Sequence, residues 1–334
     1  MFRFLSAATA ALCIAAPSFA DEVNVYSYRQ QELVEPLFEA FTEETGIKVN
    51  VVFLNKGLVE RLEAEGDRSP ADLVMTVDIS RLSGLADAGV TQAVTDPRVT
   101  QNIPAEYRDP DGHWFGLTTR ARIVYASKDR VADGEVTTYE DLADPKWAGR
   151  ICTRPGTHAY NLALISAVIS HKGEAATQTW LEGVKNNLAR KPQGNDRAQV
   201  KAIWSGQCDI SLGNTYYMGL MLDNEEQKEW ADAVRIVFPT FENGGTHVNV
   251  SGMAMTKSAP NRDNALRLME FLASPKGQEI YAETNDEYPI APGTGISARV
   301  DAWGSFTPDT VALSDLAALR AKALKLVETV NFDN

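Results

Sequence analysis

The sequence is poor in the residues that build soft-metal sites and many catalytic centres. It has 3 cysteines and 4 histidines in 334 residues, and no Cys-x-x-Cys pair. It also lacks His-Glu-x-x-His, Gly-x-Ser-x-Gly and Gly-x-x-x-x-Gly-Lys-Ser/Thr, which argues against a zinc protease, a serine hydrolase and a P-loop protein. The histidines are scattered along the sequence: His113, His158, His171 and His247. An isolated histidine is more often a surface or capping residue than a catalytic base. We therefore expect a binding protein and not an enzyme.

Long apolar runs and basic clusters are absent from the chain after residue 20. No stretch there approaches the roughly 18 apolar residues that a membrane-spanning helix needs. Acidic residues outnumber basic ones by 45 to 32, which gives a net charge of −13. Such a surface repels nucleic acid and anionic lipid, so cations are the expected partners.

The N-terminus has the features of an export signal. A lone Arg3 precedes an apolar run over residues 4–16, and residues 18–20 (Ser-Phe-Ala) fit the cleavage rule for signal peptidase. The sequence therefore predicts a signal peptide over residues 1–20 and a mature chain that begins near Asp21.

The cysteines fit an exported chain with one disulfide. Cys13 falls within the predicted signal peptide, and a lipoprotein would need a small residue where Leu12 stands. The other two, Cys152 and Cys208, then remain in an oxidising compartment, which favours a bridge between them over a metal site.

Strands and helices alternate along the chain, as in an α/β protein with largely parallel sheets. Apolar spacing predicts a helix over residues 31–44, and Gly46 lies where a helix ends. The other expected strands cover residues 23–28, 47–54, 71–77, 120–125, 150–153, 209–212 and 248–255, and the other expected helices cover residues 58–65, 160–170, 174–189, 199–205 and 264–273.

This pattern, with a turn-rich stretch over residues 145–149, predicts two lobes with a cleft between them. Each lobe is expected to have a mostly parallel sheet flanked by helices. We expect a first lobe formed by residues 21–121 and 248–290, a second lobe formed by residues 122–247, and a C-terminal helical segment, residues 291–334, packed on the second lobe.

Three tyrosines follow predicted strands. Tyr216 and Tyr217 are adjacent and come after Gly213-Asn214, while Tyr160 lies at a predicted helix start. A single tyrosine in such a place is usually a packing residue. Two consecutive side chains point in different directions on a regular backbone, so both reach one centre only at an irregular strand-to-helix junction. Phenolates are hard anionic oxygen donors and suit a small, highly charged cation such as ferric iron.

Three phenolates do not fill an octahedral shell, so an anion is expected to complete it. Backbone N–H groups of Thr157 and His158, which precede the Tyr160 helix, form one predicted anion site. Arg120 and Arg122 share a strand face and can donate to the anion or to the phenolates. Two side-chain amides, those of Asn195 and Asn214, are further candidates for binding the anion. Loop capping is the more common role for Asn195.

At these residues the chain resembles the periplasmic ferric-iron-binding proteins of ABC transporters, the transferrin-like family of bacterial ferric-binding and cyanobacterial iron-uptake proteins. The most specific match is Asn214-x-Tyr216-Tyr217, and Tyr160 falls where one subclass has a third tyrosine. Further matches over essentially the whole mature chain are Val25-Tyr26-Ser27, Thr45-Gly46-Ile47-Lys48-Val49, Ser69-Pro70-Ala71-Asp72, Trp114-Phe115-Gly116 with Arg120-x-Arg122, and Gly194-Asn195-Asp196-Arg197.

The resemblance implies a two-lobed, type II binding-protein fold that closes over the ion. It implies Fe(3+) bound by the three tyrosines, with carbonate, bicarbonate or citrate as the accompanying anion. It also implies a periplasmic monomer that delivers iron to an inner-membrane permease and its ATPase.

The chain departs from this family where the first lobe commonly supplies a ligand. Those positions read Arg29-Gln30-Gln31 and Lys56-Gly57, which offer no strong ferric ligand. Gln30 or Arg29 is expected to donate to the anion or to a metal-bound water, and Tyr28 is a weaker candidate for a fourth phenolate. The alternative function is a receptor for an organic cation or anion whose tyrosines line the pocket without binding metal. Met218 and Met221 are attributed to packing and not to copper.

Overall fold

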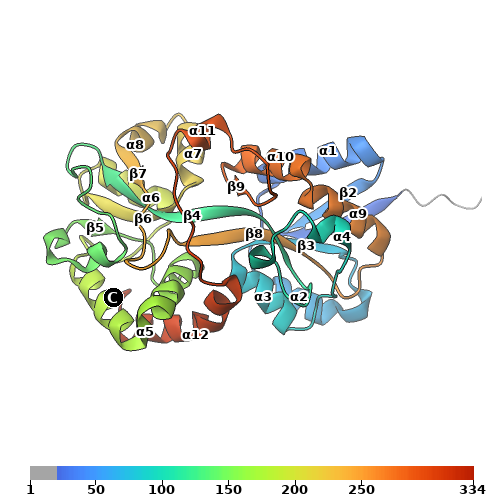
Figure 1. Cartoon of the computed structure of the whole chain (residues 1–334), viewed down its shortest axis with the longest axis horizontal. Helices are drawn as coiled ribbons and strands as arrows, with labels where there is room; N and C mark the ends of the chain where they lie inside the picture. Colours follow the sequence, from blue (N-terminus) through green and yellow to red (C-terminus); the bar gives the residue numbers. More distant parts are fainter. Residues whose placement is uncertain (1–20) are drawn as a thin grey trace, which may run out of the picture.

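The computed structural model describes residues 21–334, so the predicted signal peptide lies outside the described residues. Two α/β lobes lie along the long axis of the molecule, as predicted, and two long strands run between them (Figure 1). These strands are β4 (Phe115–Ser127) and β8 (Val248–Met255). The first part of β4 pairs with β8, whereas Arg122–Ala126 pair with a strand of the second lobe. One strand thus belongs to both lobes and fixes their connection.

The first lobe is built on three short parallel strands. β1 (Glu22–Ser27) lies between β2 (Lys48–Phe53) and β3 (Leu73–Val77), and β3 pairs antiparallel with β8. Every residue of β3 is buried, as expected for an apolar strand covered on both faces. The helices that pack around this sheet are α1 (Glu35–Thr45), α2 (Leu58–Glu65), α3 (Ile79–Asp87), α4 (Pro97–Thr100), α9 (Arg262–Ala273) and α10 (Pro275–Asn285).

The second lobe has a mixed sheet, so the prediction of a mostly parallel one is wrong there. Among the paired strands described there, only β5 (Ile151–Cys152) and β6 (Ile210–Asn214) pair in parallel. β4 runs antiparallel to β6 and to β7 (Val234–Val237). The physical reason is that β4 carries the chain from the first lobe into the second. β4 therefore runs in the opposite direction to β6 and β7, which point back toward the first lobe.

Four helices surround this second sheet. The two helices expected over residues 160–189 form one element, α5 (Ala159–Asn186), with a break at Gly173, whose φ is 77°. That backbone angle suits glycine and interrupts the helix without ending it. The other helices are α6 (Asp196–Trp204), α7 (Tyr217–Leu222) and α8 (Lys228–Asp232).

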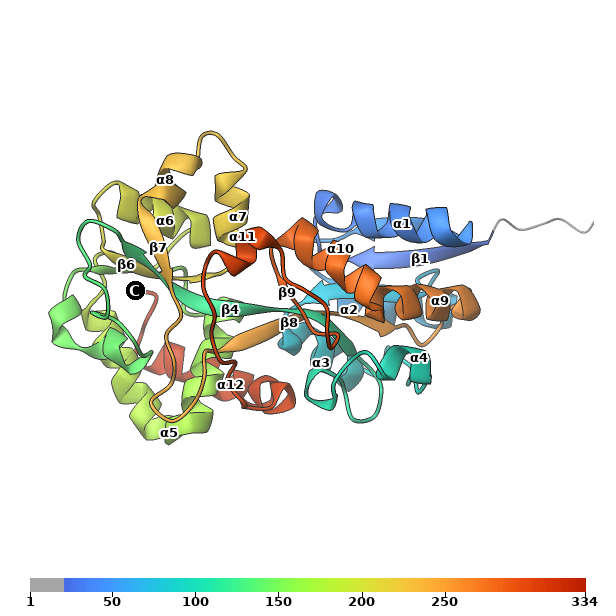
Figure 2. The same ribbon diagram turned by 45° about the horizontal axis from the view of Figure 1, so that its top comes forward.

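The C-terminal segment crosses back over both lobes (Figure 2). It continues from β9 (Tyr288–Pro289), which pairs with β4, through α11 (Ala298–Asp301) to α12 (Leu313–Thr329). α12 packs along α5 and also contacts α3 of the first lobe. Within residues 21–334, no helix has the length and apolar character needed to cross a membrane.

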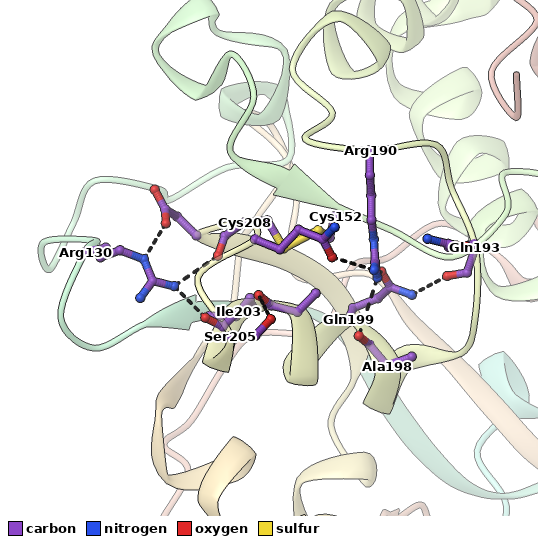
Figure 3. Close-up of a disulfide and its surroundings, with 12 residues drawn as sticks. Arg130, Cys152, Arg190, Gln193, Ala198, Gln199, Ile203, Ser205 and Cys208 are labelled. Atoms are coloured by element: carbon purple, nitrogen blue, oxygen red, sulfur yellow. Dashed lines mark hydrogen bonds and ion pairs between the residues drawn. A yellow bond between two sulfur atoms is a disulfide. The ribbon is translucent and has the colours of Figure 1, made fainter.

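The predicted disulfide between Cys152 and Cys208 is present (Figure 3). It joins β5 to the turn before β6, and both cysteines are buried. Arg130 secures the same turn because its guanidinium donates to the carbonyl of Cys208 at 3.0 Å and to the carboxylate of Asp209 at 2.6 Å. The bridge therefore holds the two parallel strands of the second lobe together at the edge of the sheet.

Candidate metal centre

The adjacent tyrosines lie at the junction between β6 and α7. β6 ends at Asn214, and α7 begins at Tyr217, so Tyr216 occupies the position just before the helix. The Thr215 N–H donates to the carbonyl of Ala121 at 3.2 Å, which ties the junction to β4. Because the backbone changes from strand to helix here, the two neighbouring rings lie against each other, with centroids 4.3 Å apart.

The third tyrosine comes from the start of α5 and meets the pair. The hydroxyl of Tyr216 donates to that of Tyr160 at 3.1 Å, although 56 residues separate them. Asn214 adds a donor, since its amide nitrogen lies 3.4 Å from the hydroxyl of Tyr216. The structure thus brings together the three tyrosines that the sequence analysis selected.

Burial holds the protons on two of these phenols. Loss of solvent, together with the neighbouring tyrosines, raises the pKa of Tyr216 well above its usual value, while Arg120 and Arg29 oppose the shift. Burial likewise raises the pKa of Tyr217. Both groups are therefore neutral near pH 7, and a metal ion that binds them must displace their protons.

Four guanidinium groups surround the tyrosine rings. Arg29 of the first lobe lies 5.8 Å from the ring centre of Tyr216. The other three lie within 6.0 Å of the ring centre of Tyr160: Arg120 at 5.8 Å, Arg122 at 6.0 Å and Arg154 at 5.0 Å. Positive charge at this range partly offsets the effect of burial and stabilises each phenolate once a metal ion has displaced its proton.

Arg122 holds the site together through a buried network. Its guanidinium donates to the carboxylate of Asp196, to Asn161 at 2.6 Å and to Asn214 at 3.0 Å. Arg154 pairs with the other carboxylate oxygen of Asp196. Although burial opposes ionisation, the two arginines hold the pKa of Asp196 below its ordinary value. Neither Asp196 nor Arg154 was selected as a site residue from the sequence. The matched segment Gly194-Asn195-Asp196-Arg197 was the signal that could have identified Asp196, whereas Arg154 has no local pattern that distinguishes it from a surface charge.

Arg120 differs from Arg122 because its charge is largely unused. Only 1% of the side chain is exposed, yet neither Nη1 nor Nη2 has a hydrogen-bond partner among the described residues. The closest carboxylate oxygen, on Asp78, is 4.0 Å away. The side chain lines a cavity of about 10 Å³ with Arg122, Tyr160, Asn214, His247 and Asn249. A buried donor of this kind is expected to bind a water molecule or an anion.

The start of α5 is filled by the chain itself. The Thr157 N–H and hydroxyl donate to the carboxylate of Asp333 at 3.2 and 2.9 Å, and the Gly156 N–H donates to it at 2.6 Å. The Nδ1 atom of His158 accepts from the Tyr160 N–H at 3.2 Å. Burial and the nearby Arg154 lower the pKa of His158 to about 3, so this imidazole is neutral. The predicted backbone anion site thus holds the side-chain carboxylate of Asp333.

The remaining predicted residues have other contacts. Asn195 is exposed and caps α6, since its side-chain oxygen accepts from the Ala198 N–H at 3.0 Å. The hydroxyl of Tyr28 accepts from the Leu58 N–H at 2.8 Å and so lies at the start of α2. Gln30 is exposed, and its side chain makes no hydrogen bond within the described residues.

No alternative metal cage is visible in residues 21–334. No group of three or more His, Cys, Asp or Glu side chains there is arranged to hold a metal ion. The tyrosine cluster is therefore the candidate centre that carries oxygen donors from separate elements to one place.

Comparisons with known proteins agree with the fold. A family model described as bacterial extracellular solute-binding protein matches residues 26–279. Iron uptake protein A1 of Synechocystis sp. is 43% identical over 314 residues, which cover 93% of this chain and 87% of that protein. Major ferric iron-binding protein of Neisseria meningitidis serogroup B is 31% identical, and the match covers 85% of each chain.

Solved structures give the same relationship. Ferric iron-binding protein A of Mannheimia haemolytica in an open conformation is 51% identical, has a TM-score of 0.90, and is matched over 94% of this chain and 100% of that one. A Trichodesmium protein in complex with iron and citrate is 40% identical, has a TM-score of 0.89, and is matched over 93% of this chain and 99% of that one. The chain therefore belongs to the bacterial extracellular solute-binding protein family, among relatives that are iron-uptake and ferric-iron-binding proteins.

Proposed function

We propose that this protein binds ferric iron through the phenolates of Tyr160, Tyr216 and Tyr217 and is the substrate-binding component of an ABC importer. The observation that carries the proposal is the meeting of three phenols from two separate helix starts, with two hydroxyls 3.1 Å apart. Hard oxygen donors that become anionic on binding match a trivalent cation. The names of the relatives and the Trichodesmium complex with iron and citrate support the same cargo.

An anion is proposed to complete the coordination shell. Three phenolates leave part of an octahedral shell open, and the buried guanidinium of Arg120 beside Tyr160 has no hydrogen-bond partner on its Nη atoms among the described residues. Carbonate, bicarbonate or citrate would supply both the oxygen donors that the metal needs and the negative charge that this guanidinium attracts. In this proposal the protein works in the periplasm as a monomer and delivers its cargo to a membrane permease and ATPase.

An organic cation is a poorer cargo for this site. Four guanidinium groups lie within 6.0 Å of the rings of Tyr160 and Tyr216, and the two carboxylates paired with them, Glu287 and Asp196, offset only part of this charge, so a positively charged organic group is repelled. A ferric ion avoids this conflict because it converts three neutral phenols into three negative charges.

The test is the double substitution Tyr216→Phe and Tyr217→Phe in the mature protein. Each change removes one hydroxyl with little change in volume, so the protein is expected to fold but to lose both ferric binding and the phenolate-to-iron absorption band. Tyr288→Phe is the matched control, because the Tyr288 hydroxyl is buried without a hydrogen-bond partner in the described residues. If the double variant still bound one ferric ion per chain with the parent's visible spectrum, the assignment would be wrong.

A further inference from the structure

A loop delivers Tyr160 to the tyrosine centre. It covers residues 153–158, between the two-residue strand β5 and the start of α5. Tyr160 is the second residue of α5, so the position of its ring depends on where this loop places the first turn of the helix. A loop lacks the regular backbone hydrogen bonds of a helix or a strand, so other contacts must fix it. We call residues 153–158 the Tyr160 loop.

The acceptor groups of the Tyr160 loop are held by α5 itself. The side-chain amide nitrogen of Asn161 donates to the hydroxyl of Thr153 at 3.1 Å. The same nitrogen donates to the carbonyls of Arg154 and Pro155 at 3.0 and 3.2 Å. These bonds use only oxygen atoms of the loop, so its N–H groups need partners from elsewhere.

Asp333, which follows α12, supplies those partners. Its carboxylate accepts from the Gly156 N–H at 2.6 Å, and from the Thr157 N–H and hydroxyl at 3.2 and 2.9 Å. Neither N–H has another acceptor among the described residues. Gly156 is buried, so water does not readily replace the carboxylate there. Loss of Asp333 would therefore leave a buried donor unpaired beside the start of α5.

Close packing holds Asp333 against the loop. The chain turns after α12 at Asn331, where φ is 54°, and Phe332 is then buried with 4% of its surface exposed. A Cβ at Gly156 would lie 2.7 Å from an atom of the Phe332 ring, so a glycine is needed for this approach. Gly156 and Asp333 are 177 residues apart in the sequence. The Tyr160 loop thus depends on a distant segment of the chain.

We propose that Asp333 is a positioning residue for iron binding, which holds the Tyr160 loop so that the Tyr160 hydroxyl meets the adjacent tyrosine pair. This inference rests on the proposed function. Tyr216 and Tyr217 share one junction, whereas Tyr160 comes from another element. The 3.1 Å approach of the Tyr160 and Tyr216 hydroxyls therefore depends on how the loop is held. Removing a group that orients a metal ligand typically lowers metal affinity about 10–100-fold.

The experiment is the substitution Asp333→Ala in the mature protein, with ferric iron titrated in competition with a chelator of known affinity. We expect the dissociation constant to rise about tenfold or more. At saturating iron, the phenolate-to-iron absorption band should shift and weaken, as it should in Tyr160→Phe. A change in stability alone does not alter this band. If Asp333→Ala fails to fold, Asp333→Asn, which keeps one acceptor oxygen, should show the same changes to a smaller extent.

Asp141→Ala is the matched control. The carboxylate of Asp141, also in the second lobe, accepts from the Thr137 N–H and hydroxyl at 2.7 and 3.1 Å and from the Thr138 N–H at 2.9 Å. It therefore makes the same kinds of contact as Asp333, but in a turn that carries none of the three tyrosines. Asp141→Ala should lower stability and keep the parent's iron affinity and spectrum. Equal effects of the two substitutions on iron binding, or a parent-like affinity and spectrum in Asp333→Ala, would overturn the proposal.

A double-variant cycle shows whether Asp333 acts through Tyr160. In a protein that already carries Tyr160→Phe, the added Asp333→Ala change should weaken ferric binding by no more than about twofold. A further tenfold loss would overturn the proposal, because Asp333 would then act on another part of the site.

Failure of the proposed function gives a different result. If Tyr160→Phe, and Tyr216→Phe with Tyr217→Phe, left ferric binding unchanged, the tyrosine assignment and this inference would both be wrong. If those variants lost iron while Asp333→Ala bound it like the parent, only this inference would be wrong.

Discussion

In the proposed function, the tyrosines of the candidate centre exchange protons for metal. Burial holds the pKa of Tyr216 and Tyr217 above the usual value, so both are protonated across the physiological range. Lowering the pH adds competing protons, and ferric affinity should therefore fall as pH falls. With up to three phenols deprotonated, the apparent affinity is expected to drop by as much as about a thousandfold per pH unit.

This pH dependence can be measured as apparent dissociation constants between pH 6 and 8 in competition with a chelator of known proton affinity. The variant Tyr217→Phe is the control, since it releases one proton fewer and should lower the slope by about one tenfold step per pH unit. A parent slope of zero would contradict binding through phenolates.

Arg122 is expected to matter for folding as well as for binding. Its replacement by alanine leaves Asp196 with one of its two arginine partners and removes a donor to Asn161 and Asn214. Breaking a buried charge pair costs about 3–5 kcal/mol. We predict a loss of this size in the free energy of unfolding of the metal-free protein, and weaker iron binding that added carbonate does not restore.

Urea denaturation measures this effect, with Arg68→Ala as the exposed control. Unchanged stability in the Arg122→Ala protein would show that Asp196 is satisfied without it. Arg120 and Arg122 lie two residues apart on β4 but differ in their contacts. The Nη atoms of Arg120 are buried without hydrogen-bond partners among the described residues, whereas Arg122 donates to three fixed acceptors, on Asp196, Asn161 and Asn214.

Among the structural elements, β5 and β6 depend on the disulfide. β5 has two residues, and the bridge closes a loop with a sequence separation of 56. A loop of this length predicts a loss of about 4 kcal/mol in unfolding free energy when both Cys152 and Cys208 become serine, mainly because the unfolded chain gains freedom. Thermal or urea unfolding checks this value.

Iron binding by the folded double-serine protein should remain, because the sulfurs are not part of the tyrosine cluster. The parent protein unfolded in the presence of reductant provides the comparison without a change of sequence. If both proteins unfolded at the same denaturant concentration as the oxidised parent, the bridge would have no role in stability.

At the scale of the whole molecule, α7 of the second lobe contacts the first lobe near the end of α10. α7, which starts at Tyr217, lies beside α11 and α10 in both ribbon views (Figures 1 and 2). A Cβ at Gly219 of α7 would overlap the carboxylate of Asp286, the residue that follows α10 and caps its C-terminus. Arg299 joins the two sides, since it donates to Asp223 at 2.7 Å and to Asp286 at 3.2 Å.

Gly219→Ala is therefore expected to hold the lobes apart and to raise the iron dissociation rate. Adding Asp286→Gly should restore the parent rate because it removes the colliding carboxylate at a position where φ is 52° and glycine is tolerated. Gly84→Ala on α3, where nothing lies within 4 Å of an added Cβ, is the control. Stopped-flow iron release and small-angle scattering would test this. An unchanged release rate in the single variant would contradict a role for this contact.

Local patterns in the sequence predicted much of the fold. Helical spacing and Gly46 identified α1, and the expected strand over residues 248–255 coincides with β8. The direction of the second-lobe strands could not be derived, because it depends on how β4 crosses between lobes. β4 itself is longer than expected, residues 115–127 against 120–125, because it is buried in both lobes.

The sequence by itself identified Tyr216 and Tyr217 as a candidate pair, since Gly213-Asn214 before them predicts an irregular strand-to-helix junction. It also determined the cysteine pair, because Cys152 and Cys208 are the two cysteines that lie outside the predicted signal peptide. The tertiary structure decided which oxygens meet, because the hydroxyls of Tyr160 and Tyr216 approach each other only when β6 and α5 are packed. It also decided that Asp333 fills the start of α5 while Arg120 keeps free donors. These outcomes depend on contacts between distant segments, and short-range patterns carry no information about such contacts.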